Sequence, residues 1–116
     1  SLQLDAALID DLHSRRVSIA IETNGTHPLP PGIDWITVSP KAGAPLVVTS
    51  GDELKLVYPQ PGAMPAEFAG LAFRQYFLQP MDGPHVKEYV QKTAEYCLAH
   101  PLWRVSLQTH KIIGLP

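Results

Sequence analysis

The sequence predicts an α/β domain built around a largely parallel sheet. Two segments carry apolar residues at helical spacing, five short runs have the composition of strands, and the twelve prolines concentrate in the connections. Helices mixed with strands favour a parallel sheet, and proline-rich loops between apolar strands are typical of rigid crossings. The length of 116 residues fits one domain with a modest hydrophobic core.

The first expected element is a helix over residues 2–15, where leucine and isoleucine recur three and four positions apart. Arg15 and Arg16 in its last turn suit the negative end of the helix dipole. The stretch SGDE at 50–53 predicts a turn before a strand, and a shorter helix is expected over 65–71. The five predicted strands cover residues 17–21, 35–39, 54–58, 73–78 and 103–107.

A second clear helix is expected after the stretch DGPH. Asp82 or Gly83 can cap this helix, and Pro84 suits its first turn, where a missing N–H has no consequence. The predicted inner face holds Val86, Tyr89, Val90, Thr93 and Cys97. The connections at 22–34 and 40–53 barely reach the dozen residues of a parallel crossover, so antiparallel pairing there stays open.

Composition excludes several classes of function. The net charge of −2 and the lack of a basic run argue against nucleic acid or an anionic membrane as a partner. No apolar stretch approaches the length of a membrane span. The lone Cys97 rules out an internal disulfide framework and predicts a reducing, cytoplasmic location. The five histidines have no spacing that suits a metal site, so we expect most of them on the surface.

Polar residues follow four of the five predicted strands. In parallel sheets and barrels, ligands bind outside the carboxyl ends of the strands. Any one of these stretches could simply end a strand, but four together favour a ligand site, although spacing alone does not name the ligand. The four stretches are Glu22-Thr23-Asn24-Gly25, Ser39-Pro40-Lys41, Gln79-Pro80-Met81-Asp82 and Gln108-Thr109-His110.

Five motifs give the chain a resemblance to a known family. The sequences IAIETNGT, DWITVSPKAG, DELKLVYPQ, YFLQPMDGP and the terminal WRVSLQTHKIIGLP occur along residues 17–116. Together they resemble the C-terminal part of the 7-carboxy-7-deazaguanine synthases, which are radical S-adenosylmethionine enzymes. VSPK or ETNG alone is weakly specific, whereas LQPMDGP followed by SLQTHKIIGLP is far more specific.

The resemblance implies a fold, a reaction and a set of cofactors. The expected fold is the C-terminal part of a modified, partial (β/α) barrel. The implied reaction is a ring contraction of 6-carboxy-5,6,7,8-tetrahydropterin to 7-carboxy-7-deazaguanine with loss of ammonia, on the pathway to queuosine, a tRNA modification, and other deazapurines. The implied cofactors are S-adenosylmethionine, a [4Fe–4S] cluster and Mg²⁺, and the family's enzymes look like homodimers.

The chain departs from this family pattern in its cysteines. A cubane cluster needs three or four thiolate ligands, and Cys97 has no cysteine partner. Ser1 leads straight into a helical pattern, so we expect a fragment or a processed product. Residues 1–116 are therefore expected to form the C-terminal part of the barrel domain, without the N-terminal part that binds the cluster. Alone, they are expected to be inactive as a carbon–nitrogen lyase.

The resemblance also assigns cofactor-binding residues. Hydroxyl, amide and ammonium groups suit the ribose hydroxyls and the carboxylate of S-adenosylmethionine. Amide and main-chain groups suit an adenine edge, against which a methionine can pack. The residues implied are Thr23, Asn24, Ser39, Pro40, Lys41, Gln79, Pro80, Met81 and Asp82, and no residue is assigned to a metal or to the catalytic step.

The C-terminal tail is expected to contact the substrate. In the family this end reaches the substrate site, so the terminal carboxylate of Pro116 and the ring of His110 are implied to bind the pterin. A carboxylate facing amino and ring N–H groups makes a charge-assisted contact. Ile112, Ile113 and Leu115 would then anchor the tail.

Two other interpretations stay open. One is a fragment of an activase for glycyl-radical enzymes, whose substrate is a protein loop that needs no buried C-terminal carboxylate. The other is a non-enzymatic ligand-binding domain, complete as it stands. Such a domain should be monodisperse and well folded, whereas a severed half-barrel should dimerise, aggregate or melt early, because an unpaired sheet edge invites pairing.

Overall fold

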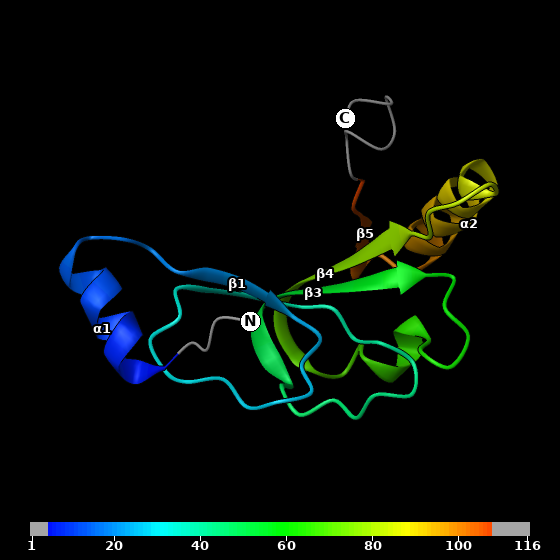
Figure 1. Ribbon diagram of the computed structural model, residues 1–116. Coiled ribbons are helices and arrows are strands. Elements are labelled where there is room, and N and C mark those ends of the chain that lie inside the picture. The colour runs from blue at the N-terminus through cyan, green and yellow to red at the C-terminus, as the bar shows by residue number, and fades with distance from the viewer. Residues whose placement is uncertain (1–4, 108–116) are drawn as a thin grey trace.

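The structure is a computed structural model that describes residues 5–107. Five strands lie in the sheet in their order along the chain, and each pairs in parallel with the next (Figure 1). The predicted α/β class is confirmed, and both connections that stayed open cross in parallel. The elements are α1 (Ala6–Ser14), β1 (Ala20–Thr23), β2 (Trp35–Val38), β3 (Ser50–Tyr58), the 3₁₀ helix η1 (Pro65–Glu67), β4 (Ala72–Pro80), α2 (Val86–Ala99) and β5 (Trp103–Val105).

Helix α1 is capped at both ends by local hydrogen bonds. The Asp5 carboxylate accepts the N–H of Leu8 at 2.8 Å, which satisfies a donor of the first turn. At the other end Arg16 has a φ of 61° and follows the helix, so the two arginines do not lie in its last turn as predicted. The N–H of Val17 then bonds Leu12, which is why β1 begins at Ala20 and not at residue 17.

One predicted turn and one predicted helix differ from the structure. The stretch 50–53 belongs to β3, because Gly51 pairs with Phe73 of β4 and the Asp52 carboxylate accepts the N–H of Ile36 at 2.8 Å. The helix expected over 65–71 is only the short η1. The Glu67 carboxylate in η1 accepts the N–H of Met64, the residue directly before this helix. The remaining strand ends agree with the predicted ones to within two residues.

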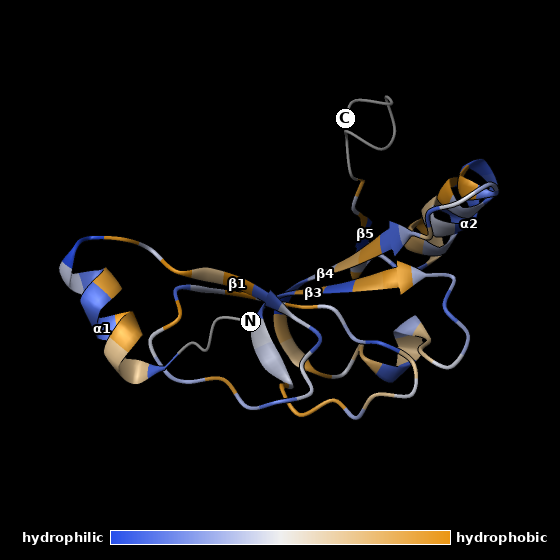
Figure 2. Ribbon diagram, viewed as in Figure 1, coloured by the Kyte–Doolittle hydropathy of each residue, from blue (hydrophilic) through white to orange (hydrophobic). Residues whose placement is uncertain are grey.

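Helix α2 begins later than its predicted caps. His85 is the N-cap and makes no side-chain cap bond, while the Asp82 carboxylate accepts the neighbouring N–H of Gly83 at 3.0 Å. The predicted inner face is confirmed, because Thr93 is fully buried and Cys97 packs against the core. Figure 2 shows hydrophobic and hydrophilic residues side by side on both α1 and α2, as amphipathic helices require.

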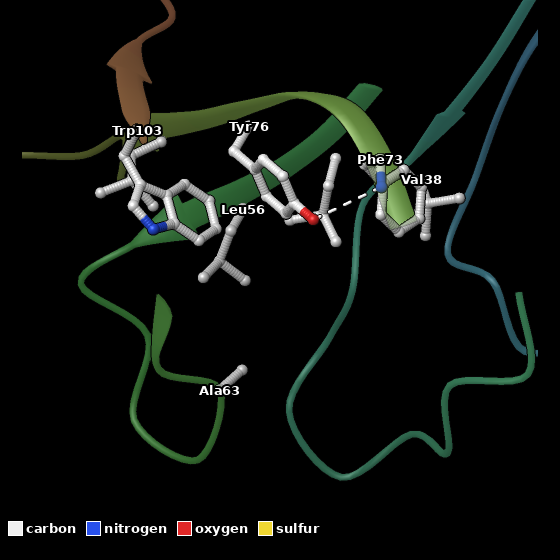
Figure 3. Packing of buried hydrophobic residues seen from close by; sticks show 8 residues of the cluster. Val38, Leu56, Ala63, Phe73, Tyr76 and Trp103 are labelled. Atoms are coloured by element: carbon white, nitrogen blue, oxygen red, sulfur yellow. Dashed lines mark hydrogen bonds between the residues drawn. The ribbon is translucent and has the colours of Figure 1, made fainter. Parts of the chain in front are cut away.

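The hydrophobic core lies on one face of the sheet. Tyr76 packs between Phe73 and Trp103, with ring centroids 6.1 and 5.3 Å away (Figure 3). Its hydroxyl donates to the carbonyl of Leu71, so the buried ring keeps its polar group satisfied. The other buried members of this core are Val38, Leu54, Leu56, Ala63 and Leu78.

The strand register separates the sheet into two chemically different faces. Thr23, Val38, Leu54, Tyr76 and Trp103 are register partners across the five strands and lie in a row on the core face. One residue earlier in the first four strands, the row reads Glu22, Thr37, Glu53 and Gln75 on the opposite face. Both faces of an all-parallel sheet are usually apolar, so a polar row is unusual and marks a face with another role.

No helix among residues 5–107 is long and apolar enough to cross a membrane.

Candidate functional site

A polar cavity lies at the carboxyl ends of β1 and β2. It has a volume of about 330 Å³ and is lined by Glu22, Thr23, Asn24, Ser39 and Lys41. We call it the rim cavity. Four of these five residues are among the predicted cofactor residues, and they come from two strand ends that parallel pairing brings together.

The chain folds here through backbone bonds that hold the two strand ends side by side. The N–H of Ser39 bonds the carbonyl of Thr23 at 2.7 Å, which extends the ladder one residue past β2. The Thr23 hydroxyl accepts the N–H of Gly25 at 3.1 Å, and the Asn24 amide oxygen accepts from Thr26. These local bonds form a tight turn that presents Thr23 and Asn24 at the edge of the sheet.

Gly25 fixes this turn against the loop after β2. Its φ is 76°, and its carbonyl accepts the N–H groups of Val47 and Val48 at 2.7 and 3.0 Å. A Cβ at this position would lie 2.6 Å from Leu46 Cδ1 and 2.9 Å from Val38 Cγ1. Only glycine fits, because both the conformation and the close approach exclude a side chain.

The rim cavity offers polar groups that are not engaged elsewhere. Within residues 5–107, the Lys41 ammonium forms no ion pair and the Asn24 amide nitrogen donates no hydrogen bond. An ammonium and an amide N–H₂ are donors that suit a carboxylate or ribose hydroxyls, and the Glu22 carboxylate suits an ammonium. The donor set therefore fits the polar groups of S-adenosylmethionine.

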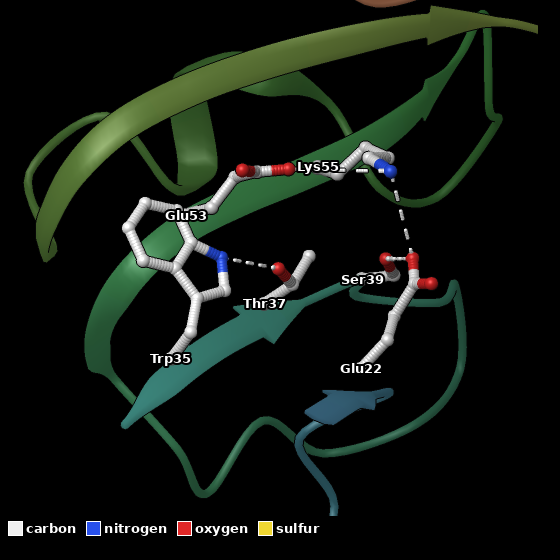
Figure 4. A network of polar contacts seen from close by, with 6 residues as sticks. All are labelled: Glu22, Trp35, Thr37, Ser39, Glu53 and Lys55. Atoms are coloured by element: carbon white, nitrogen blue, oxygen red, sulfur yellow. Dashed lines mark hydrogen bonds and ion pairs between the residues drawn. The ribbon is translucent and has the colours of Figure 1, made fainter. Parts of the chain in front are cut away.

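Glu22 is the residue of the rim cavity to which sequence reasoning assigns no ligand. One carboxylate oxygen, Oε1, accepts the Ser39 hydroxyl at 3.1 Å and lies 3.8 Å from the Lys55 ammonium (Figure 4). The signal in the sequence is its place directly after a predicted strand. Its contact with Lys55 could not be foreseen, because it depends on the register of three strands.

The remaining predicted residues lie in other places. Pro40 lines a neighbouring, mostly apolar cavity of about 570 Å³ that shares Lys41 with the rim cavity. Gln79 and Pro80 end β4, two strands away from β2, and the N–H of Met81 bonds the carbonyl of Tyr58 at 2.9 Å. The stretch 79–82 thus lies at the same edge of the sheet but does not line the rim cavity.

The predicted tail contacts, His110 and Pro116, lie outside the described residues. The other four histidines are exposed, as predicted. His13 Nε2 lies 2.8 Å from an Asp34 oxygen that also accepts the N–H of Ile19 at 2.6 Å. This contact links α1 to the connection between β1 and β2.

Neither an iron–sulfur cluster nor a divalent cation finds a ligand set in the described part of the chain. Cys97 packs against the core from α2, and burial raises the pKa of its thiol, which disfavours the thiolate that a cluster needs. Among residues 5–107, no three side chains of histidine, cysteine, aspartate or glutamate come together as a metal site. The residues present therefore do not fit a cluster.

The fold and the rim cavity define an α/β protein with a polar cavity at the carboxyl edge of a parallel sheet. The chain is 60% identical over 115 residues to a 7-carboxy-7-deazaguanine synthase of Bordetella pertussis, a match that covers 99% of this chain and 55% of the relative. It is equally similar, with the same coverage, to the enzyme of that name from Caulobacter vibrioides. The enzyme of Bacteroides thetaiotaomicron is 44% identical, with 99% and 60% covered.

These relatives confirm the resemblance to the 7-carboxy-7-deazaguanine synthases. The chain spans about half the length of the relatives it matches, which agrees with the prediction that it corresponds to one part of such an enzyme. No protein-family model matches the chain.

Proposed function

We propose that this chain is the C-terminal, cofactor- and substrate-binding part of a 7-carboxy-7-deazaguanine synthase. The complete enzyme would be a cytoplasmic, homodimeric radical S-adenosylmethionine lyase that converts 6-carboxy-5,6,7,8-tetrahydropterin to 7-carboxy-7-deazaguanine with loss of ammonia. The observation that carries the proposal is the rim cavity, where four residues assigned by the resemblance meet on a chain that is 60% identical to such synthases.

In this proposal the rim cavity binds the polar end of S-adenosylmethionine. When bound, this cofactor and the cluster, held by residues outside this chain, together with Mg²⁺, supply the radical chemistry. Lys41 would hold the carboxylate, Asn24 and Thr23 the hydroxyls, and Glu22 an N–H donor. The volume of about 330 Å³ is near the lower limit for ligand pockets, so it suits one end of the cofactor. The stretch Gln79–Asp82 would then meet the adenosine end.

The first test is the binding of S-adenosylmethionine to this chain, measured by isothermal titration calorimetry. A hydrogen bond to a charged group contributes about 1.5–3 kcal/mol, so Lys41→Ala should weaken binding by about ten- to a hundredfold. Lys87→Ala is the matched control, because it removes an exposed lysine from α2, away from the cavity. Equal affinity of the Lys41→Ala variant and the wild type would refute the assigned site.

The second test concerns the tail and uses the complete enzyme. If the carboxylate of Pro116 binds the pterin, one or more residues added after it should raise the KM for the pterin sharply. The same residues added within the exposed turn at Gly70, where no atom lies within 4 Å of an added Cβ and which does not line the rim cavity, serve as a control. An extended tail with unchanged steady-state kinetics would count against the assigned substrate contact.

The relatives favour the synthase over an activase for glycyl-radical enzymes, because the enzymes matched over 98–99% of the chain carry the synthase name. An activase would bind S-adenosylmethionine but not the pterin. Titration of the complete enzyme with the pterin therefore separates the two functions.

A further inference from the structure

The polar face of the sheet contains one lysine on its central strand, and this lysine lies next to Glu22, a residue that lines the rim cavity. Lys55 belongs to β3 and follows Glu53 on the same face, two residues closer to the carboxyl edge. Only 23% of its side chain is exposed, although lysines usually reach into solvent. A lysine side chain that is mostly buried on a central strand needs a reason to be there.

The contacts of Lys55 are two carboxylates. Its Nζ lies 3.8 Å from Oε1 of Glu22 and 4.0 Å from Oε1 of Glu53. The Glu53 side chain is only 18% exposed and lies beside Lys55 on the same strand. In Figure 4, Glu53 and Lys55 lie beside each other along β3, and the Lys55 ammonium reaches across toward Glu22 on β1, with Ser39 beside Glu22.

The two oxygens of Glu22 have different surroundings. Oε1 accepts the Ser39 hydroxyl at 3.1 Å and faces the Lys55 ammonium, while the other oxygen points away from both (Figure 4). Within the described part of the chain, that second oxygen, Oε2, accepts no hydrogen bond, and Oε1 is the oxygen nearer to the Lys55 ammonium. Because Glu22 lines the rim cavity, Oε2 is the oxygen that a bound ligand can use.

The contacts of Lys55 with the two carboxylates contribute little to the stability of the fold. Charge-assisted N–H···O bonds are about 2.7–2.9 Å long, and both distances to Lys55 exceed this range. The Glu22 side chain is 59% exposed, and ion pairs of this kind contribute little to stability. A lysine kept mostly buried without a large stabilising contact is better explained by its effect on the neighbouring carboxylate.

We propose that Lys55 is a positioning residue of the rim cavity. Together with Ser39 it holds Oε1 of Glu22, so that Oε2 is presented to an N–H donor of the ligand. This inference rests on the proposed function, and two ligands carry such donors. S-adenosylmethionine has an ammonium group, and 6-carboxy-5,6,7,8-tetrahydropterin has amino and ring N–H groups.

The test measures the position of Glu22 and ligand binding separately, with this chain in solution. The variants are Lys55→Met, Lys55→Arg, Glu22→Gln, the double variant Glu22→Gln/Lys55→Met, and Lys92→Met as a control. Lys92 also pairs with a glutamate, at 3.4 Å, but does so on α2. The side-chain carboxyl ¹³C resonance of Glu22 reports its surroundings, and calorimetry gives the affinity for each of the two ligands.

The expected result has three parts. Lys55→Met should shift the Glu22 carboxyl resonance and weaken binding of one of the two ligands by about five- to tenfold, a typical coupling between contacting residues. Lys55→Arg should restore most of both signals, and Lys92→Met should change neither. In the Glu22→Gln background, Lys55→Met should have little further effect. The ligand whose affinity falls is the one that uses Oε2.

Three outcomes would overturn the proposal. An unchanged Glu22 resonance in Lys55→Met would show that Lys55 does not position this carboxylate. A shifted resonance with unchanged affinity for both ligands would show that the position is not used in binding. Equal losses from Lys55→Met with and without Glu22 would show that Lys55 acts on the ligand by itself.

The failure of the proposed function would look different. A wild-type chain that binds neither ligand would contradict the assigned site, yet the Glu22 resonance would still decide whether Lys55 positions it. If Lys55→Met unfolds, Lys55→Arg and Glu22→Gln replace it in the test. Lys55→Arg keeps the positive charge but carries it on a planar guanidinium group. An Arg variant with the wild-type resonance and affinity then supports the role, and Glu22→Gln with wild-type affinity for both ligands refutes it.

Discussion

Replacement of Gly25 by alanine should destabilise the chain and distort the rim cavity together. The turn after β1 places Asn24 at the cavity and Gly25 directly behind it, with a φ of 76°. The new Cβ would lie 2.6 Å from Leu46 Cδ1 and 2.9 Å from Val38 Cγ1. Leu46 can turn its methyl group away, but Val38 is fully buried in the core and has no free space.

The magnitude follows from two separate costs. A left-handed conformation costs a residue with a Cβ about 1–2 kcal/mol, and overpacking a filled core costs about 1–3 kcal/mol. We therefore expect Gly25→Ala to lose about 2–5 kcal/mol of the free energy of unfolding. Gly43 is a matched control, because its φ is 81° and an added Cβ would meet no atom within 4 Å. Gly43→Ala should lose only the first amount.

Urea unfolding followed by circular dichroism measures both costs. With an m-value of about 2 kcal/mol/M, the packing cost alone separates the midpoints of the two variants by about 0.5–1.5 M. The change in unfolded-state entropy is the same for both glycine-to-alanine replacements and cancels in the comparison. Equal midpoints would refute the reasoning, because they would show that Val38 and Leu46 accommodate the methyl group without cost.

Three further predictions concern other parts of the fold. Leu56→Ala empties a fully buried position and should cost about 2–5 kcal/mol in the same urea assay; a loss below 1 kcal/mol would contradict the described core. Asp34 has a pKa below its ordinary value of 3.8, held down by the backbone N–H of Ile19 and then by His13. Since the folded-state pKa is the lower one, this stabilisation is complete above the ordinary value and is lost as pH falls through the folded pKa. The melting temperature of Asp34→Asn should therefore be lower than that of the wild type at pH 6, with the gap closing in acid; a gap that is constant with pH would exclude this cause. Burial raises the pKa of the Cys97 thiol, so alkylation by iodoacetamide at pH 8 should be slow in the native chain and fast in urea, and equal rates would contradict its packing.

The sequence predicted the arrangement of the strand ends better than their limits. Polar stretches after strands were enough to place Thr23, Ser39 and Lys41 in one cavity, because parallel pairing gathers carboxyl ends at one edge. The start of β3 was mispredicted, because Gly51 and Asp52 have low strand propensity and are held there by partners on both sides.

Other features depend on contacts that no local pattern encodes. His85 caps α2 without a side-chain bond, so the usual signals pointed to Asp82 and Gly83 instead. The link from Lys55 to Glu22 joins residues on β3 and β1, and it requires both the register and the intervening strand. Such contacts become visible only when the three strands are aligned.

The strand order also bears on how the chain folds. Paired residues of neighbouring strands are separated by 15 positions for Ala20 and Trp35 (35 − 20) and by 27 for Tyr76 and Trp103 (103 − 76). Loop-closure entropy grows only as the logarithm of length, so these two pairings differ by about 0.5 kcal/mol. Each strand can therefore dock on the one made just before it during synthesis, and assembly from β1 to β5 needs no strand to wait for a distant partner.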